Sequence, residues 1–138
     1  MIKIVSTILS VLVLNSTLFA DDMAEKIQIQ NQEIVKLAAE ELTSQLPQKI
    51  DDYTQLVKIE GKKQSLVYTY EINTGAKSDD TVINEDKSRM KKAVTKGICD
   101  SSERFLTSGI DISYIYASAK SKKELFRFDV SREDCVKK

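Results

Sequence analysis

The stretch KGICDSSERFLTSGIDISYIYAS, from Lys96 to Ser118, contains the features that decide the fold: a cysteine, the end of a helix and a strand. Gly109 is the residue type that commonly follows a helix, because it adopts left-handed backbone angles without strain. After it, large apolar side chains alternate with small or polar ones, a period of two that is typical of a β-strand. The large apolar residues are Ile110, Ile112, Tyr114 and Tyr116.

Two β-hairpins are predicted. The first strand above is followed by a polar turn at residues 120–123 and by a second alternating segment, which contains Phe126, Phe128 and Val130. An earlier hairpin is predicted from residues 52–61 and 64–73, with its turn near Gly61. Its second strand alternates through Leu66, Tyr68, Tyr70 and Ile72.

Two segments predict helices. Residues 23–46 are rich in helix formers and end before Pro47, the only proline. Their expected apolar stripe is Ile27, Ile34, Leu37, Ala38, Leu42 and Leu46. Residues 74–86 resemble a polar loop. Near the end of this segment, Asn84 is expected to cap a second helix that continues through residue 98. Its expected stripe is Met90, Ala93, Val94 and Ile98, and Gly97 is expected to kink it or to divide it from residues 99–108.

The order helix, hairpin, helix, hairpin predicts an α+β fold. Four antiparallel strands would form a sheet with one apolar face, and the helices would cover that face to give a two-layer α/β sandwich.

The N-terminus has the pattern of a secretory signal peptide. Lys3 precedes an apolar run, residues 4–14, and Ala20 stands before two aspartates. The run is shorter than the roughly 20 residues that a membrane-spanning helix needs. We therefore expect cleavage after Ala20 and a soluble periplasmic chain with no stable membrane span. A buried core helix or a short membrane anchor is the alternative interpretation. No cysteine follows the run, so a lipid anchor is not indicated.

The chain has two cysteines and no histidine. In an oxidising compartment these cysteines predict one disulfide, between Cys99 and Cys135. In the chain-entropy description a loop of this size stabilises the fold by about 3–4 kcal/mol. A reactive thiol would favour a basic partner or C-x-x-C spacing, and a zinc site would need about four ligands. We therefore expect no metal and no cofactor.

Composition argues against nucleic-acid binding and against catalysis. The 21 basic and 21 acidic residues leave no basic excess. Without histidine there is no Ser-His-Asp triad, and the four isolated glycines form no phosphate-binding loop. Acidic pairs such as Asp51-Asp52 lie in polar stretches and are interpreted as solvated surface. We expect a protein that is not an enzyme.

Four tyrosines fall at alternating positions on two predicted strands: Tyr68, Tyr70, Tyr114 and Tyr116. The simpler interpretation is packing within the core. The alternative is a surface that binds a helix or strand of a partner, because tyrosine is rigid and amphipathic and anchors interfaces well. If the second interpretation holds, these four tyrosines are the predicted partner-binding residues.

The second part of the chain resembles a known family. Leu46-Pro47 is followed by two strands that end in tyrosines, then by Cys99, Arg104 and Leu106, by SGIDISYIY from Ser108 to Tyr116, and by REDC from Arg132 to Cys135. This order resembles the small disulfide-bearing pilotins of type II secretion, the GspS-beta type, over roughly residues 46–135. The resemblance implies a four- to five-stranded sheet packed by helices, held by a disulfide, and a role in binding a secretin subunit and helping it to assemble.

We thus expect a signal peptide over residues 1–20, an N-terminal helix over residues 21–46 and a pilotin-like α+β domain over residues 47–138. The functional hypothesis is a periplasmic, non-enzymatic, pilotin- or chaperone-like module that holds a peptide segment of an envelope or secretion-system protein. The alternative is a periplasmic inhibitor or immunity protein that blocks an envelope enzyme.

Overall fold

The computed structural model describes residues 2–136, with side chains described from Ala20 onward. The chain divides into two compact units, residues 1–30 and residues 31–138. The first unit is the N-terminal part of helix α1, Ile2–Thr43, where Lys26 pairs with Asp22 one turn away at 3.1 Å. The side chains of the expected leader, up to residue 19, lie outside the described residues, so the signal peptide stays a prediction.

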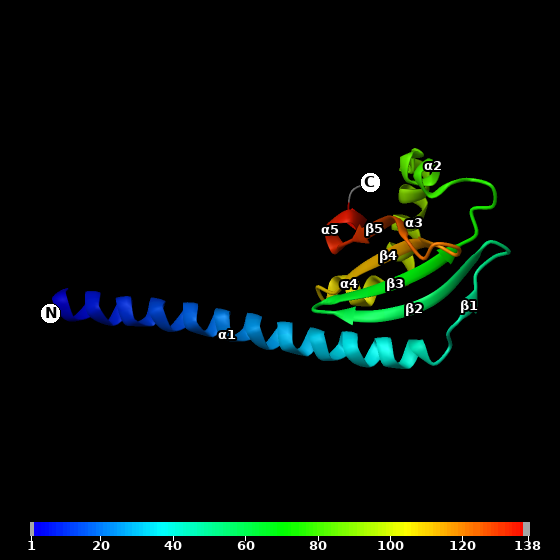
Figure 1. Ribbon diagram of the computed structural model, residues 1–138. Coiled ribbons are helices and arrows are strands. Elements are labelled where there is room, and N and C mark those ends of the chain that lie inside the picture. The colour runs from blue at the N-terminus through cyan, green and yellow to red at the C-terminus, as the bar shows by residue number, and fades with distance from the viewer. Residues whose placement is uncertain (1, 137–138) are drawn as a thin grey trace. The chain divides into compact units, whose positions relative to one another are not determined.

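The second unit contains a five-stranded sheet in the order β1-β2-β3-β4-β5 (Figure 1). The strands are β1 Gln48–Lys49, β2 Thr54–Lys62, β3 Ser65–Ile72, β4 Asp111–Ser118 and β5 Glu124–Val130. The helices besides α1 are α2 Asp79–Asn84, α3 Ser88–Ser101, α4 Glu103–Thr107 and α5 Arg132–Val136. The α+β class, the number of strands and both hairpins are confirmed.

The central pair of strands differs from the expected antiparallel sheet. β3 and β4 are parallel, and all the other neighbouring strands are antiparallel. The reason is the connection: each hairpin is antiparallel by construction, whereas α2, α3 and α4 carry the chain from the end of β3 back to the start of β4. A helical crossover between adjacent strands returns them in the same direction.

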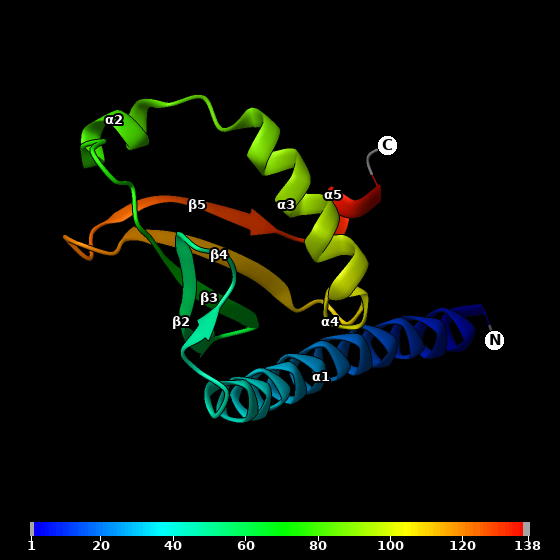
Figure 2. The same cartoon turned by 90° about the vertical axis from the view of Figure 1, so that its right-hand side faces the viewer.

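The core lies on one face of this sheet. Its strands are in register so that three rows of side chains cross β3, β4 and β5: Leu66–Ile112–Val130, Tyr68–Tyr114–Phe128 and Tyr70–Tyr116–Phe126. Val35 of α1, Ile98 of α3 and Leu106 of α4 pack in the same buried cluster, so the helices cover this face. The part of α1 from Asn31 onward lies along the β2 side of the sheet and α3 along the β5 side (Figure 2).

The buried stripe of α1 differs from the expected one. Val35 and Ala39 are buried, and Ala38 and Leu42 are partly buried as expected, but Ile27, Ile34 and Leu37 are exposed. The helix also ends at Thr43 rather than at Leu46. The expected stripe and the buried stripe lie next to each other on α1. The backbones of α1 and β2 approach closely at Gly61, and this favours burial of the stripe with the smaller side chains.

Gly61 is not the turn of the first hairpin but a residue of β2. The turn is Lys63-Gln64, and Lys63 has a φ of 54°. A β-carbon placed on Gly61 would lie 2.6 Å from Cγ1 of Val35 and 3.2 Å from the Val35 carbonyl carbon. Gly61 therefore allows α1 to seat directly on β2.

The connection between the hairpins contains more helix than expected. The predicted loop includes α2, whose N-cap Ser78 accepts a hydrogen bond from the Thr81 N–H at 3.2 Å. Asn84 ends α2 and does not cap α3. Instead Asp86 accepts from the N–H of Ser88, the first residue of α3, at 2.9 Å.

α3 continues through Gly97 without the expected division, and Cys99 lies inside it. Of its expected stripe, Ile98 is buried and Val94 is partly buried, whereas Met90 and Ala93 are exposed. The predicted stop at Gly109 is confirmed: it follows α4 with a φ of 86°, and the next residue, Ile110, donates its N–H back to the Phe105 carbonyl at 2.9 Å.

Candidate protein-binding site

The four predicted tyrosines meet on the helix-covered face of the sheet, together with Phe126. We call these five residues the aromatic row. Tyr70 stacks on Tyr116 with 5.1 Å between ring centroids, and Tyr116 stacks on Phe126 at 4.8 Å. Tyr114 lies 5.2 Å from Tyr68 and 5.0 Å from Tyr70, at a tilt in both cases. The sequence alternation thus produces one continuous aromatic contact surface across three strands.

The four tyrosines are not equally accessible. Tyr70 and Tyr116 are buried, with 8% and 7% of their surface exposed. Tyr68 and Tyr114, which face each other across the two central strands, are half-buried. One step earlier on the same strands, Leu66 and Ile112 are fully buried. Tyr68 and Tyr114 thus remain partly accessible to solvent between the buried residues that precede and follow them on the same face of the two central strands.

The phenols of Tyr68, Tyr70 and Tyr116 have pKa values above the ordinary one and stay protonated at neutral pH. Burial raises the pKa of Tyr116 to about 12, and the neighbouring Tyr114 adds to the shift. Burial also raises the pKa of Tyr70 and of Tyr68, with a further contribution from Tyr114 in both cases. The row can therefore offer neutral hydroxyl donors and apolar rings to a partner.

An accessible apolar side chain of α1 lies beside this row. Lys36 and Glu40 line a surface cavity at the outer edge of β2. Residues of an α-helix advance by about 100°, so Ile34 lies on the flank of α1 opposite to Lys36, toward β3 and β4, whereas Leu37 is only about 60° from Glu40 and points away from the sheet. Ile34 is 36% exposed and Leu37 is 55% exposed.

α3 presents a similar flank from the other side. Cys99 points to α5, which follows the edge strand β5. By the same helical spacing, Met90, Ala93 and Gly97 lie on the flank opposite to Cys99, toward the central strands. Met90 and Ala93 are exposed, and a β-carbon on Gly97 would meet no atom within 4 Å. The apolar flanks of α1 and α3 thus both face the region of Tyr68 and Tyr114.

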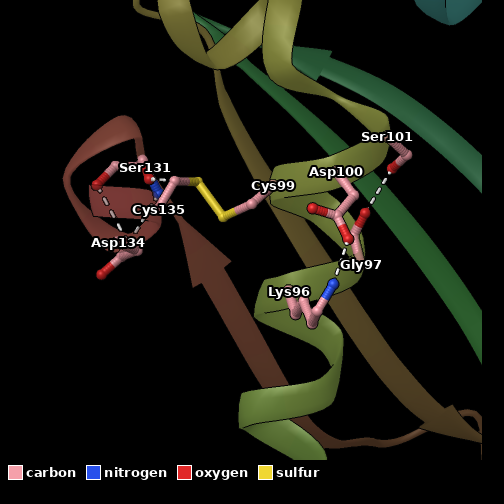
Figure 3. The surroundings of a disulfide bond; sticks show 8 residues. All are labelled: Lys96, Gly97, Cys99, Asp100, Ser101, Ser131, Asp134 and Cys135. Atoms are coloured by element: carbon pink, nitrogen blue, oxygen red, sulfur yellow. Dashed lines mark hydrogen bonds and ion pairs between the residues drawn. A yellow bond between two sulfur atoms is a disulfide. The ribbon is translucent and has the colours of Figure 1, made fainter. Parts of the chain in front are cut away.

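The disulfide fixes α3 over the sheet. Cys99 of α3 and Cys135 of α5 are bonded, with 5.6 Å between their Cα atoms (Figure 3). α5 is held in turn by Asp134, which accepts from the N–H of Ser131 at 2.8 Å. This confirms the predicted pairing and shows its effect: the end of β5 is tied to α3, and α3 forms one side of the site.

Asn31 of α1 is a residue that the sequence analysis missed. Its side chain is buried, and its Nδ2 donates to the Ser108 carbonyl at 2.8 Å and to Oε1 of Gln64 at 3.1 Å. It positions α1 against the turn of the first hairpin and the end of α4. The sequence feature that could have indicated its burial is the four-residue spacing from Val35, because this spacing places both residues on the buried stripe of α1.

Residues 29–126 match the family described as a domain of unknown function, DUF8479. The chain belongs to this family. No curated protein sequence matches this DUF8479 chain.

Three solved structures share the fold of this DUF8479 chain. The pilotin EpsS of the Vibrio vulnificus type 2 secretion system has a TM-score of 0.67 and 13% identity, over 83% of this chain and 99% of that one. The type II secretion pilotin AspS of Vibrio cholerae has a TM-score of 0.62 and 16% identity, over 82% and 98%. A protein of Pseudomonas aeruginosa described as secreted has a TM-score of 0.70 and 10% identity, over 79% and 96%. The predicted resemblance to pilotins is confirmed in the fold.

The described side chains, from Ala20 to Val136, include no cluster of histidine, cysteine, aspartate or glutamate that could hold a metal ion. Among the described residues, no helix is both long enough and apolar enough to cross a membrane.

Proposed function

We propose that this DUF8479 protein is an exported, non-enzymatic binding module of the pilotin type, which holds a segment of an envelope protein against the aromatic row. The observation that carries the proposal is the half-buried pair Tyr68 and Tyr114 in the middle of the sheet, with accessible apolar flanks of two helices on either side. The fold shared with two type II secretion pilotins makes a secretin subunit the first partner to test.

The proposal is tested by co-purification of the chain with the secretin of the same organism, both produced in a bacterial envelope. We expect Tyr68→Ala and Tyr114→Ala each to reduce recovery of the secretin about tenfold or more, because aromatic anchors at the centre of an interface contribute about 2 kcal/mol or more. Tyr53→Ala is the matched control, since Tyr53 is 70% exposed and lies outside the row.

Tyr70 and Tyr116 are unsuitable for this test. Both are buried in the core, and truncation of a buried aromatic residue costs about 3–5 kcal/mol of folding stability. A loss of binding in those variants would not separate contact from folding. Far-UV circular dichroism, which reports the backbone, should instead match the wild type for the Tyr68 and Tyr114 variants. Full recovery of the secretin by both variants would contradict the proposed site.

A second comparison tests the flank of α1. Ile34→Glu places a charge on the flank that faces the aromatic row, and Lys36→Glu places one on the opposite flank. We expect only Ile34→Glu to reduce recovery of the secretin. Capture of a hydrolase instead of a secretin would favour an inhibitor of an envelope enzyme.

Export is tested separately. Mass spectrometry of the chain from a periplasmic fraction should show an N-terminus at Asp21, after removal of residues 1–20. Recovery of the full-length chain from the cytoplasm with free thiols would contradict an exported module.

A further inference from the structure

The outer edge of β2 is largely free. β1 pairs only with Gln55 and Leu56, and the sheet ends on this side. Within the described chain, no strand therefore covers β2 from Val57 to Lys62. A free sheet edge presents a row of main-chain donors and acceptors, and extended peptides bind by adding a strand to such an edge. This edge is a different surface from the aromatic row, which lies on the helix-covered face.

The main-chain groups at this edge can be assigned from the register. Lys62 and Ser65 flank the two-residue turn, and the flanking pair of such a turn is hydrogen-bonded. Pairing alternates along an antiparallel ladder, so the N–H and C=O groups of Gly61 and Ile59 point away from β3. A contact of 3.4 Å from the Thr43 hydroxyl to the Ile59 carbonyl oxygen agrees with this assignment.

A surface cavity of about 760 Å³ lies at the same place. It is lined by Ile59 and Gly61 of β2 and by the flank of α1 that carries Lys36, Glu40 and Thr43. Its volume is within the range of about 300–1,000 Å³ that is usual for ligand sites. An added strand would thus have the main chain of β2 on one side and the wall of α1 beneath it.

The charges at this edge select the partner. The edge and the cavity carry more positive than negative side chains. Two are acidic, Glu40 and Glu60, and four are basic: Lys36, Lys58, Lys62 and Lys63. Lys58 and Lys62 both turn toward Glu60, at 3.1 Å and 3.9 Å, and remain mostly exposed. The whole chain has no net charge, so this excess is local. It disfavours pairing with a second copy, because two positive edges would then meet.

We propose that an acidic, extended segment of a partner protein adds to the sheet as a strand at the outer edge of β2, bonded to the main chain of Ile59 and Gly61. The acidic side chains of that segment lie opposite Lys58 and Lys62 on the open face of the sheet. This interaction is independent of the aromatic row and of the secretin proposed for it.

The probe is the peptide Ser-Glu-Val-Asp-Val-Glu-Ser, attached after Lys138 of the full chain by a flexible glycine–serine linker of about 30 residues. Such a linker reaches about 30 Å and gives an effective concentration near the millimolar range. Hydrogen exchange measured by NMR reports on the amides of Ile59 and Gly61. The amide of Glu60 faces β3 and is the internal reference.

We expect exchange at Ile59 and Gly61 to slow by about tenfold or more with the acidic strand and to remain fast when its valines are replaced by proline. A strand with lysines in place of its acidic residues should give little protection. Lys58→Glu with Lys62→Glu should reverse this preference, and near-UV circular dichroism checks that this variant is folded.

Three results would overturn the proposal. The first is unchanged exchange with the acidic strand attached. The second is equal protection by the acidic and the lysine strands. The third is protection of Ile59 and Gly61 in the untethered chain that increases with protein concentration, which would make a second copy the occupant.

Discussion

Asn31 and Ser108 are separated by 77 positions in the chain, and the side-chain amide of Asn31 donates to the Ser108 carbonyl at 2.8 Å. The same nitrogen donates to Oε1 of Gln64. One buried amide therefore joins α1 to the turn of the first hairpin and to the end of α4, and it does so directly before the helical turn that carries Val35.

This link predicts the effect of Asn31→Ala. The substitution removes both hydrogen bonds of this buried amide, and one hydrogen bond contributes about 0.5–1.5 kcal/mol, so the two together contribute about 1–3 kcal/mol. We expect the free energy of unfolding in urea to fall by about that amount. Gln32→Ala, at the exposed neighbouring position, is the control and should change it by less than about 0.5 kcal/mol. Equal effects of the two substitutions would contradict the link.

Two glycines predict opposite responses to the same substitution. Gly61→Ala places a methyl group against Val35, whose side chain is buried and stiff, and should destabilise the fold by about 1–3 kcal/mol. Gly97→Ala adds a methyl group in open space within α3 and should stabilise it by about 0.5–1 kcal/mol. Thermal unfolding of the two variants provides the comparison. A stabilised Gly61→Ala would show that α1 does not seat on β2.

The disulfide predicts a strong dependence on oxidation. Removing the link between Cys99 and Cys135 should lower the free energy of unfolding by about 3–4 kcal/mol. Single Cys99→Ala, single Cys135→Ala and the double variant should be similar, because each breaks the same bond. Urea unfolding of the wild type with and without dithiothreitol is the direct measurement. An unchanged midpoint in the reduced protein would rule out a stabilising role for the bond.

The aromatic row predicts loss of stability at alkaline pH. Folding raises the pKa of Tyr116 from 10.0 to about 12. A phenol with a raised pKa contributes its full stability below pH 10, and this contribution is lost as the pH rises through 12. Tyr116→Phe should therefore lose less stability than the wild type between pH 10 and pH 12. Tyr53→Phe serves as the control, and identical pH profiles for all three proteins would contradict the prediction.

The strands were predictable because their signal is local. A sheet with one covered face requires apolar residues at every second position, and Ile112, Tyr114 and Tyr116 follow that rule. The tyrosines of the candidate site were found for the same reason. Their different burial was not, because it depends on where α1 and α3 lie and not on the strands themselves.

The stripe of α1 shows what a local pattern leaves open. Ile34 and Leu37 fit a helical period as well as Val35 and Ala39 do, and the larger side chains made the first set the natural choice. Gly61, 26 positions after Val35, is what favours the other set, because it brings the two backbones together. The parallel direction of β3 and β4 likewise follows from the connection between the hairpins and not from either hairpin.

The position of Cys135 has a consequence for how the molecule is completed. A chain synthesised or exported from its N-terminus presents Cys99 before β4 and β5, but its bonding partner Cys135 emerges after all the strands of the described residues. The covalent link therefore cannot direct the earlier pairing of strands. The disulfide forms only after all the strands are available, and it then stabilises the folded domain. A truncated product that lacks the last few residues would have no disulfide and would be more susceptible to degradation.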